Sequence, residues 1–339
     1  MKLSFETVKS IVTGAVVIRE DADGGITLRR FTEQQQSVYD PTSGNFRSTM
    51  DTASIALDFY TDSDFFRFTA DGLREKGEDF VVFDLLVNGQ LSETVRFSHT
   101  GEKAEARHIP YGPVGDTFFL PEGEKRITFY LPWGACARLL SVELSDGAFV
   151  RPHTCDRTWI AFGDSITHGA YADHPALTYV NQLSRMLNAQ VYNFGIGGER
   201  FREKKVIKGS YPKCDFVTVA YGTNDYRHQT KEAFDTKMPS FLRQVAEEFP
   251  DVPVFVITPL WRNAENDGKT WNMGRPLAEV RSLIAAEAAK YPNFHVVDGP
   301  ALVPHSHDFY GDKTNLHPND AGFAHYAANL YHTIVPLLD

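Results

Sequence analysis

Apolar and polar positions alternate along short stretches of the first 150 residues, and turn signals lie between these stretches. In Ile26-Thr27-Leu28-Arg29 and Ile127-Thr128-Phe129-Tyr130-Leu131 the alternation follows the two-residue period of a half-buried strand. Strands are expected over residues 15–19, 26–31, 53–59, 65–69, 80–86, 93–98, 126–130 and 140–144. No helical period of useful length appears among them. The pattern therefore predicts an all-β antiparallel sandwich of jelly-roll type over residues 1–150.

The pattern changes after residue 150, where compact apolar runs are separated by longer stretches with helical spacing. The expected strands cover residues 158–162, 190–194, 216–221, 254–258 and 294–297, and the expected helices cover 176–187, 231–249, 276–290 and 320–333. Short buried strands that alternate with helices predict a doubly wound parallel sheet in a three-layer αβα fold. We interpret residues 151–156 as a linker, which divides the chain into a sandwich domain (1–150) and an α/β domain (151–339).

The sandwich also contains aromatic residues that suit a sugar-binding face. They are Tyr39, Tyr60, Tyr111 and Trp133. The alternative, which we favour, is that these rings fill the core of the sandwich.

Composition narrows the range of partners. The chain has 339 residues and a formal net charge of −10, and no basic cluster offsets this charge, which argues against nucleic acid. No stretch of about 18 apolar residues is present, so we expect no membrane span. The amino terminus lacks the apolar core of a secretory signal, and a cytoplasmic location is expected. The three cysteines, Cys136, Cys155 and Cys214, are scattered, which predicts reduced thiols and no zinc site.

Ser165 follows the first predicted strand of the second half, in Gly163-Asp164-Ser165. Ligands bind at the carboxyl ends of strands in open α/β sheets. A serine at such an end, ahead of a helix, lies beside backbone N–H groups without helical acceptors. Ser165 is therefore a candidate nucleophile, although a serine that caps a helix has the same local sequence.

Other predicted strand ends carry further polar groups. Gly195, Gly197 and Gly198 leave backbone N–H groups unobstructed, which suits an oxyanion, whereas the glycine pattern of a nucleotide-binding loop is absent. Asn224 is able to donate to an oxyanion or to form an Asx turn. His317, held by the following proline, suits a general base, but a plain loop histidine is the other interpretation.

These four turns, taken in order, resemble the SGNH/GDSL hydrolase family. The matching blocks are Gly163-Asp164-Ser165-Ile166-Thr167, Gly198, Gly222-Thr223-Asn224-Asp225 and His317-Pro318-Asn319-Asp320. The resemblance covers about residues 157–335 and implies a flavodoxin-like fold. It also implies that Ser165 attacks an ester carbonyl while His317 takes the serine proton. The oxyanion would then be held by the backbone N–H groups of Ser165 and Gly198 and by the Asn224 side chain.

The triad acid departs from the family pattern. The family usually places an aspartate three residues before the histidine, and Thr314 occupies that position here. Asp312, five residues before His317, is the nearest upstream acid. Two interpretations stay open: Asp312 orients His317 across a two-residue insertion, or Ser165 and His317 form a dyad with a backbone carbonyl as the orienting group.

Two further acids and one histidine-rich stretch contain groups able to act in catalysis or to bind a metal. Asp164 and Asp225 each adjoin a motif residue in a tight turn, and we expect them to cap backbone N–H groups. A metal hypothesis would rest on His305, His307, Asp308 and His317. Two histidines at i, i+2 without further well-spaced ligands are poor evidence for a metal, so neither metal nor cofactor is expected.

The loop after the fourth strand, residues 258–272, is expected to overhang the strand ends. It is polar and contains Trp261 and Trp271, which suits sugar rings better than lipid, although both rings could instead pack against the sandwich. His168, Tyr226 and Arg227 adjoin motif residues and are further candidates for substrate contacts.

The order of the two halves is similar to that of carbohydrate esterase family 2, whose members remove acetyl groups from sugars and sometimes lack the aspartate. The sequence thus predicts a metal-independent serine esterase that deacetylates a carbohydrate, with a small-molecule or oligosaccharide ester as its partner. The alternatives are a general acyl-esterase, thioesterase or lipase, or a carbohydrate-binding protein with an inactive hydrolase half. The sugar, the acetylated position and the oligomeric state are left open.

Overall fold

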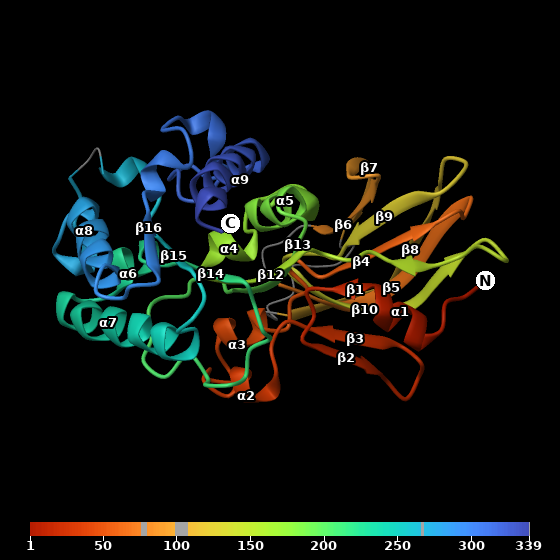
Figure 1. Ribbon diagram of the computed structural model, residues 1–339, viewed down its shortest axis with the longest axis horizontal. Helices are drawn as coiled ribbons and strands as arrows, with labels where there is room; N and C mark the ends of the chain where they lie inside the picture. The colour runs from red at the N-terminus through yellow and green to blue at the C-terminus, as the bar shows by residue number, and fades with distance from the viewer. Residues whose placement is uncertain (76–79, 99–107, 266–267, 339) are drawn as a thin grey trace.

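The structure is a computed structural model that describes residues 1–75, 80–98, 108–265 and 268–338. Figure 1 shows the strands of the first half at the right and, at the left, a sheet surrounded by helices. The strand-rich first half and the parallel sheet of the second half are both confirmed.

The first half forms two antiparallel sheets. One has the order β1-β4-β9-β6-β7, with β11 also paired to β4, and the other has the order β2-β3-β10-β5-β8. The strands of the first sheet are β1 (Val12–Thr13), β4 (Ala56–Thr61), β6 (Phe80–Val87), β7 (Gln90–Ser98), β9 (Lys125–Tyr130) and β11 (Arg151–Pro152). Those of the second are β2 (Val17–Glu20), β3 (Ile26–Arg29), β5 (Phe65–Glu75), β8 (His108–Phe119) and β10 (Ala135–Leu144). Phenylalanine rings fill the space between the sheets, with Phe68 and Phe129 only 4.6 Å apart.

All strands expected in the first half are present, but the sequence pattern missed others. The strand β8 contains Pro110, Pro113 and two glycines, which disfavour a central strand. It lies at the edge of its sheet and pairs with β5 alone, where a missing N–H is tolerated. A helix was also missed: α1 (Phe5–Ile11) is capped by Ser4 and buries only Val8 and Ile11. The expected linker begins with β11, which extends the sandwich by two residues.

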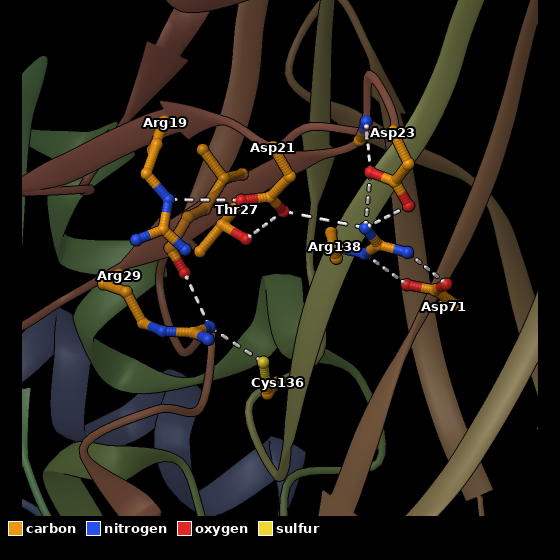
Figure 2. A network of polar contacts seen from close by, with 10 residues as sticks. Arg19, Asp21, Asp23, Thr27, Arg29, Asp71, Cys136 and Arg138 are labelled. Carbon is orange, nitrogen blue, oxygen red and sulfur yellow. Dashed lines mark hydrogen bonds and ion pairs between the residues drawn. The ribbon is translucent and has the colours of Figure 1, made fainter.

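Charged side chains on the second sheet are paired with one another. Arg138 on β10 donates through two nitrogens to Asp71 on β5, at 2.9 and 2.8 Å. It also donates to both carboxylate oxygens of Asp23, in the turn between β2 and β3, at 2.9 and 2.7 Å. Figure 2 shows this network, in which one guanidinium joins groups from three places in the sheet.

The second half forms a parallel sheet of order β13-β12-β14-β15-β16. In chain order this is 2-1-3-4-5, the flavodoxin-like order. Its strands are β12 (Arg157–Gly163), β13 (Ala189–Gly195), β14 (Phe216–Ala220), β15 (Val254–Ile257) and β16 (Phe294–Val297).

Four longer helices cover the parallel sheet on both faces. Ile160 and Phe162 of β12 share a core with α7 (Lys231–Glu248) and α8 (Leu277–Ala288). Trp159 and Ala161 point to the other face, where α5 (Tyr179–Met186) and α9 (Asp320–Ile334) pack. The alternation along one strand thus produces the three predicted layers, as Figure 1 shows.

A segment of the first half packs on the second. Residues 30–52, with α2 (Glu33–Gln36) and α3 (Gly44–Ser48), leave the sandwich and lie near the parallel sheet in Figure 1. Phe31 and Tyr39 join the core on the α7 and α8 face. The expectation that Tyr39 fills the sandwich core is therefore wrong.

The other three sandwich aromatics differ in their surroundings. Trp133 packs against the core beneath α5 and α9, so its expected place in the sandwich core is also wrong. Tyr111 packs against the sandwich core as expected. Tyr60 is half-buried, and the Arg151 guanidinium lies 4.1 Å from the centre of its ring.

Two predictions from composition concern the whole chain. Within the described ranges, no helix has both the length and the apolar character needed to cross a bilayer. The structure describes all three cysteines, and each is a free thiol.

Candidate active site

Three neighbouring strands of the parallel sheet end in one row. Gly163 of β12 is in register with Gly195 of β13 and with Ala220 of β14. Ser165, Gly198 and Asn224 follow these row positions within two to four residues. Parallel register therefore brings the three candidate residues to one edge of the sheet, although long stretches of chain separate them.

Ser165 is the first residue of a one-turn helix, α4 (Ser165–His168), which the sequence pattern did not predict. Its N-cap is Asp164, whose Oδ1 accepts from the Ile166 N–H at 3.0 Å, so the expected capping role of Asp164 is observed. A Cβ at position 163 would lie 1.9 Å from Thr167 Oγ1, so the tight turn before Ser165 requires glycine. Burial raises the pKa of Asp164 to about 6.

Ser165, His317 and Asp312 form a row of hydrogen bonds. Ser165 Oγ lies 2.8 Å from His317 Nε2, and His317 Nδ1 lies 2.9 Å from Asp312 Oδ2. In this arrangement the imidazole is able to take the serine proton while the carboxylate fixes its tautomer. The serine side chain is 8% exposed, so its surroundings strengthen electrostatic interactions.

The loop before His317 shows how Asp312 reaches the histidine despite the altered spacing. Asp312 Oδ2 also accepts from the backbone N–H of His317 at 2.8 Å, and Oδ1 accepts from the backbone N–H of Thr314 at 2.8 Å and from the Thr314 hydroxyl. Asn315 has a φ of 50°, which turns the chain between these donors. Burial opposes ionisation of Asp312, but the hydrogen bonds from His317 and Thr314 hold the pKa of its carboxyl well below its usual range.

Tyr171 covers one face of His317, and no sequence signal singled it out. The two rings are stacked, with centroids 4.7 Å apart and an interplanar angle of 13°. The tyrosine is 50% exposed and has a φ of 71°, a left-handed conformation that costs energy for a residue with a bulky side chain. It therefore forms a wall of the site and limits the movement of the imidazole.

The three predicted oxyanion donors have compatible local geometry. Ser165 lies in the first turn of α4, where backbone N–H groups have no helical acceptor. Gly198 has a φ of 71° in the turn closed by the bond from the Glu199 N–H to the Ile196 carbonyl, and the space on its Cβ side is open. Asn224 lies in the one-turn helix α6 (Thr223–His228), and its Nδ2 donates one bond to the Glu199 carbonyl at 3.1 Å. The amide has a second N–H for a ligand.

The glycine turn, residues 195–198, accepts hydrogen bonds from side chains of residues 30–52 in the first half. Arg30, which is 1% exposed, donates to the carbonyls of Asn193 and Gly195 at 2.7 and 2.8 Å. Asn45 Nδ2 donates to the Gly197 carbonyl at 3.0 Å. These contacts fix the backbone on which Gly198 lies, and sequence reasoning missed them because both donors precede the turn by about 150 residues.

Asp225, like Asp164, serves the backbone. Its Oδ1 accepts from the Phe201 N–H at 3.1 Å and from Gln229 Nε2 at 2.7 Å. Asp225 is fully buried, and this burial raises the pKa of its carboxyl to about 8. It therefore ties the chain after the glycine turn to α6, which agrees with the expected structural role.

Two of the predicted substrate contacts lie inside the protein. His168 is 4% exposed and lies 3.4 Å from Asp51 Oδ2. Tyr226 is fully buried, and its hydroxyl donates to the Lys269 carbonyl, which anchors the loop after β15. Neither ring is placed on the surface of the site.

The other predicted substrate contacts lie on or beside the loop after β15, of which Asn266 and Asp267 lie outside the described residues. Trp271 is 41% exposed, and the Arg227 guanidinium lies 5.0 Å from the centre of its indole. Trp261 is half-buried and stacks on His305 with centroids 4.9 Å apart. Trp271 and Arg227 thus remain available to a ligand, whereas Trp261 is largely used in packing.

In the described parts of the chain, no group of three or more histidine, cysteine, aspartate or glutamate residues is placed to hold a metal ion. In the histidine-rich stretch, the His305 ring stacks on Trp261, and His317 is hydrogen-bonded to Ser165 and Asp312.

Comparison with known proteins gives the following matches. Residues 161–325 match the model of the GDSL-like lipase/acylhydrolase family. No curated protein sequence matches the chain significantly.

Among solved structures, a salicylyl-acyltransferase from a tetracycline biosynthetic pathway is 20% identical over 96% of this chain and 94% of its own, with a TM-score of 0.74. An acetyl xylan esterase from the rumen bacterium Butyrivibrio proteoclasticus is 12% identical over 100% of this chain and 98% of its own, with a TM-score of 0.65. A family two carbohydrate esterase from Cellvibrio japonicus is 13% identical over the same shares, 100% and 98%, with a TM-score of 0.64. At these identities the likeness concerns the fold, and it extends over both halves of the chain.

Proposed function

We propose that this chain is a serine esterase that hydrolyses short acyl esters, in keeping with the match of residues 161–325 to the GDSL-like lipase/acylhydrolase family model. The observation that carries the proposal is the hydrogen-bonded row of Ser165, His317 and Asp312, with distances of 2.8 and 2.9 Å. A serine beside a histidine, itself oriented by a carboxylate, is the arrangement that activates a hydroxyl for acyl transfer.

The proposed reaction begins when Ser165 Oγ attacks the ester carbonyl and His317 Nε2 takes the serine proton. Asp312 holds Nδ1–H and stabilises the imidazolium that forms. The backbone N–H groups of Ser165 and Gly198 and the free N–H of Asn224 bind the oxyanion. His317 then protonates the leaving alcohol, and water, activated by the same imidazole, hydrolyses the acyl-enzyme.

We further propose an acetyl group on a carbohydrate as the substrate. The order of the two halves and the fold of the whole chain are similar to those of the family two carbohydrate esterase, and a second structural relative is an acetyl xylan esterase. Trp271 offers an exposed flat ring beside the strand ends, which suits a sugar. In this proposal residues 1–150 are a jelly-roll-like accessory domain and residues 151–339 the catalytic domain.

The test is hydrolysis of p-nitrophenyl acetate by the purified protein beside Ser165→Ala, each with and without a chelator. In a serine protease, loss of the nucleophile lowers kcat by about 10⁶. We expect a comparable loss in Ser165→Ala, an unchanged melting temperature, and no effect of the chelator. Equal rates in both proteins would exclude Ser165 as the nucleophile.

A ladder of p-nitrophenyl esters then tests the acyl group. Preference for acetyl over longer chains supports the acetylesterase proposal, and preference for long chains favours a general acyl-esterase or lipase. Inactivity of the wild type on every ester would favour a carbohydrate-binding protein.

A further inference from the structure

Arg262 is a buried cation at the edge of the sheet that carries the proposed active site. It is 2% exposed, and its Nη1 donates to the carbonyl and the hydroxyl of Thr223, at 3.2 and 3.1 Å. Thr223 directly precedes Asn224, a proposed oxyanion donor. The Nε of Arg262 is buried and has no hydrogen-bond partner within the described part of the chain. Burial of a guanidinium with neutral partners alone is costly, which is why such groups are usually paired.

Two more arginines lie on the same elements as the proposed oxyanion donors. Arg227 is one helical turn after Asn224 on α6, a spacing that places both on one face of the helix. Arg200 comes two residues after Gly198. Both side chains are half-buried. Burial and the charges of Arg227, Arg200 and Arg262 lower the pKa of His228, so all three cations act on this end of α6.

The nearby acids do not neutralise this cluster by contact. In the ranges that the structure describes, no carboxylate lies within ion-pair distance of Arg200, Arg227 or Arg262. Asp312 and Asp164 act on Arg262 only at longer range. Asp312 is occupied by the donors around His317, and Asp164 by the N–H of Ile166. A group of cations without carboxylates in contact is unexpected in a chain whose formal net charge is −10.

We propose that the positive region of Arg200, Arg227 and Arg262 binds a carboxylate of the substrate, with Arg227 as the group in contact and the buried charge of Arg262 behind it, so that the enzyme acts on esters of anionic molecules, such as an acetylated acidic sugar. The guanidinium is suited to this task because its planar fork binds carboxylates through two parallel hydrogen bonds. The exposed ring of Trp271, already stacked with Arg227, would hold the neighbouring part of the same molecule. This inference rests on the proposed function and specifies its substrate.

The test compares two matched pairs of esters that differ in one charge. 4-Acetoxybenzoate and its methyl ester carry or lack a carboxylate on the alcohol side, and p-nitrophenyl hydrogen succinate and p-nitrophenyl butyrate do so on the acyl side. We expect kcat/KM of the wild type to be about tenfold higher for the charged member of one pair, as one charge-assisted contact contributes about that factor. The pair that shows the preference identifies the side of the ester on which the carboxylate lies.

Substitutions then assign the preference to the arginines. Arg227→Gln and Arg262→Gln should each reduce the charged-to-neutral ratio of kcat/KM by about tenfold, and because the ratio is taken within one variant, any change common to both esters cancels. Arg262→Lys, which keeps the charge but loses the fork, covers the case in which Arg262→Gln does not fold. The matched control is Arg243→Gln on α7, whose side chain is exposed and pairs with Glu247 at 3.8 Å; it should change neither rate.

Two results would overturn the inference. One is a wild type without preference in either pair, and the other is an Arg227→Gln variant that keeps the wild-type ratio. If the wild type hydrolyses no ester at all, the proposed function fails first. Calorimetric binding of 4-hydroxybenzoate to the wild type and to Arg227→Gln then decides the carboxylate site separately: weaker binding by the variant supports it, and equal binding excludes it.

Discussion

Arg138 on the sandwich and Arg262 at the edge of the parallel sheet are surrounded in opposite ways. Arg138 is partly exposed and is bonded to Asp71 and Asp23, with Asp21 3.6 Å away (Figure 2). Arg262 is almost fully buried, and among the described residues the hydrogen bonds of its side chain go only to Thr223. Of these two guanidinium groups, the partly exposed one is balanced by carboxylates, whereas the buried one has neutral partners.

The same contrast holds for the acids. On the sandwich, Asp58 accepts two bonds from Arg126, at 2.8 and 2.7 Å. At the strand ends Asp164 and Asp225 accept bonds from neutral donors, and burial raises the pKa values of both. Polar groups that are buried and incompletely paired reduce stability, and they cluster at functional sites. The difference teaches that the sandwich is arranged for stability and the strand-end edge for chemistry.

Asp312→Asn should break this comparison most strongly, because activity should fall far more than stability. An asparagine can still accept from the Thr314 N–H, but it cannot fix the tautomer and stabilise the imidazolium as a carboxylate does. By analogy with serine proteases we expect kcat to fall by about 10⁴. The measurement is p-nitrophenyl acetate turnover beside the melting temperature, with Thr314→Val as a control that loses less than about tenfold. A loss below tenfold in Asp312→Asn would support the Ser–His dyad.

Arg30→Met tests a buried side chain that supports the backbone of the proposed active site. The change removes four bonds, to the carbonyls of Asp51, Asn193, Gly195 and Ser48. Buried acceptors without donors should lower the free energy of unfolding by about 3–5 kcal/mol, and the released glycine turn should lower kcat/KM. Urea denaturation measures the first effect. The control is Arg29→Met, because in the described part of the chain the hydrogen bonds of the Arg29 side chain go to Leu28 and Cys136 and not to the glycine turn. Equal losses in both variants would argue against a specific support.

Asp225→Asn should sharpen the comparison by showing that a buried acid at the strand ends makes the free energy of unfolding depend on pH. The pKa of this carboxyl is about 8 in the folded protein and, as in any exposed aspartate, about 4 in the unfolded chain. Between these values the folded state holds the extra proton, so stability falls as pH rises, with a slope of at most about 1.4 kcal/mol per pH unit. The variant should lose this slope between about pH 4 and 8. Chemical denaturation across that range measures it, and identical slopes in both proteins would contradict the assignment.

Arg138→Met should have the smallest effect. The pairs are partly exposed, which weakens them, but they are bidentate and form a network, so we expect the free energy of unfolding to fall by about 1–2 kcal/mol at low salt. The difference should shrink further in 1 M salt, where screening weakens the pairs in the wild type. Esterase activity should not change. A large loss of activity would show that the two regions are not separate in function.

The sequence predicted the parallel sheet well, because its strands are short apolar runs between amphipathic helices. The helices α4 and α6 escaped prediction although both carry site residues. Each is between one and two turns long, and a helical period is not visible in so few positions. Motif order nevertheless placed Ser165, Asn224 and His317 at strand ends, where the structure has them.

The parts that the sequence could not provide depend on contacts between distant residues. Spacing alone left the role of Asp312 open, because it does not show that Thr314 and His317 fold around the carboxylate. Tyr226 and His168 adjoin motif residues, yet their side chains point into the protein. Arg262 stands in a polar loop and has no local feature that separates it from its neighbours. Burial decided each of these cases, and burial is a property of the fold.

The support of the glycine turn by Arg30 also has a consequence for how the chain reaches its final form. The bonds from Arg30 to Asn193 and Gly195 join residues that are 163 and 165 positions apart. During synthesis, Phe31 and Tyr39 therefore lack their partners in the second half until β13 and its neighbours have been made. Contacts of such long range form late and slow folding. The second half is consequently not an independent folding unit. Without residues 1–150 it would lose part of its own core and the Arg30 hydrogen bonds that support its glycine turn.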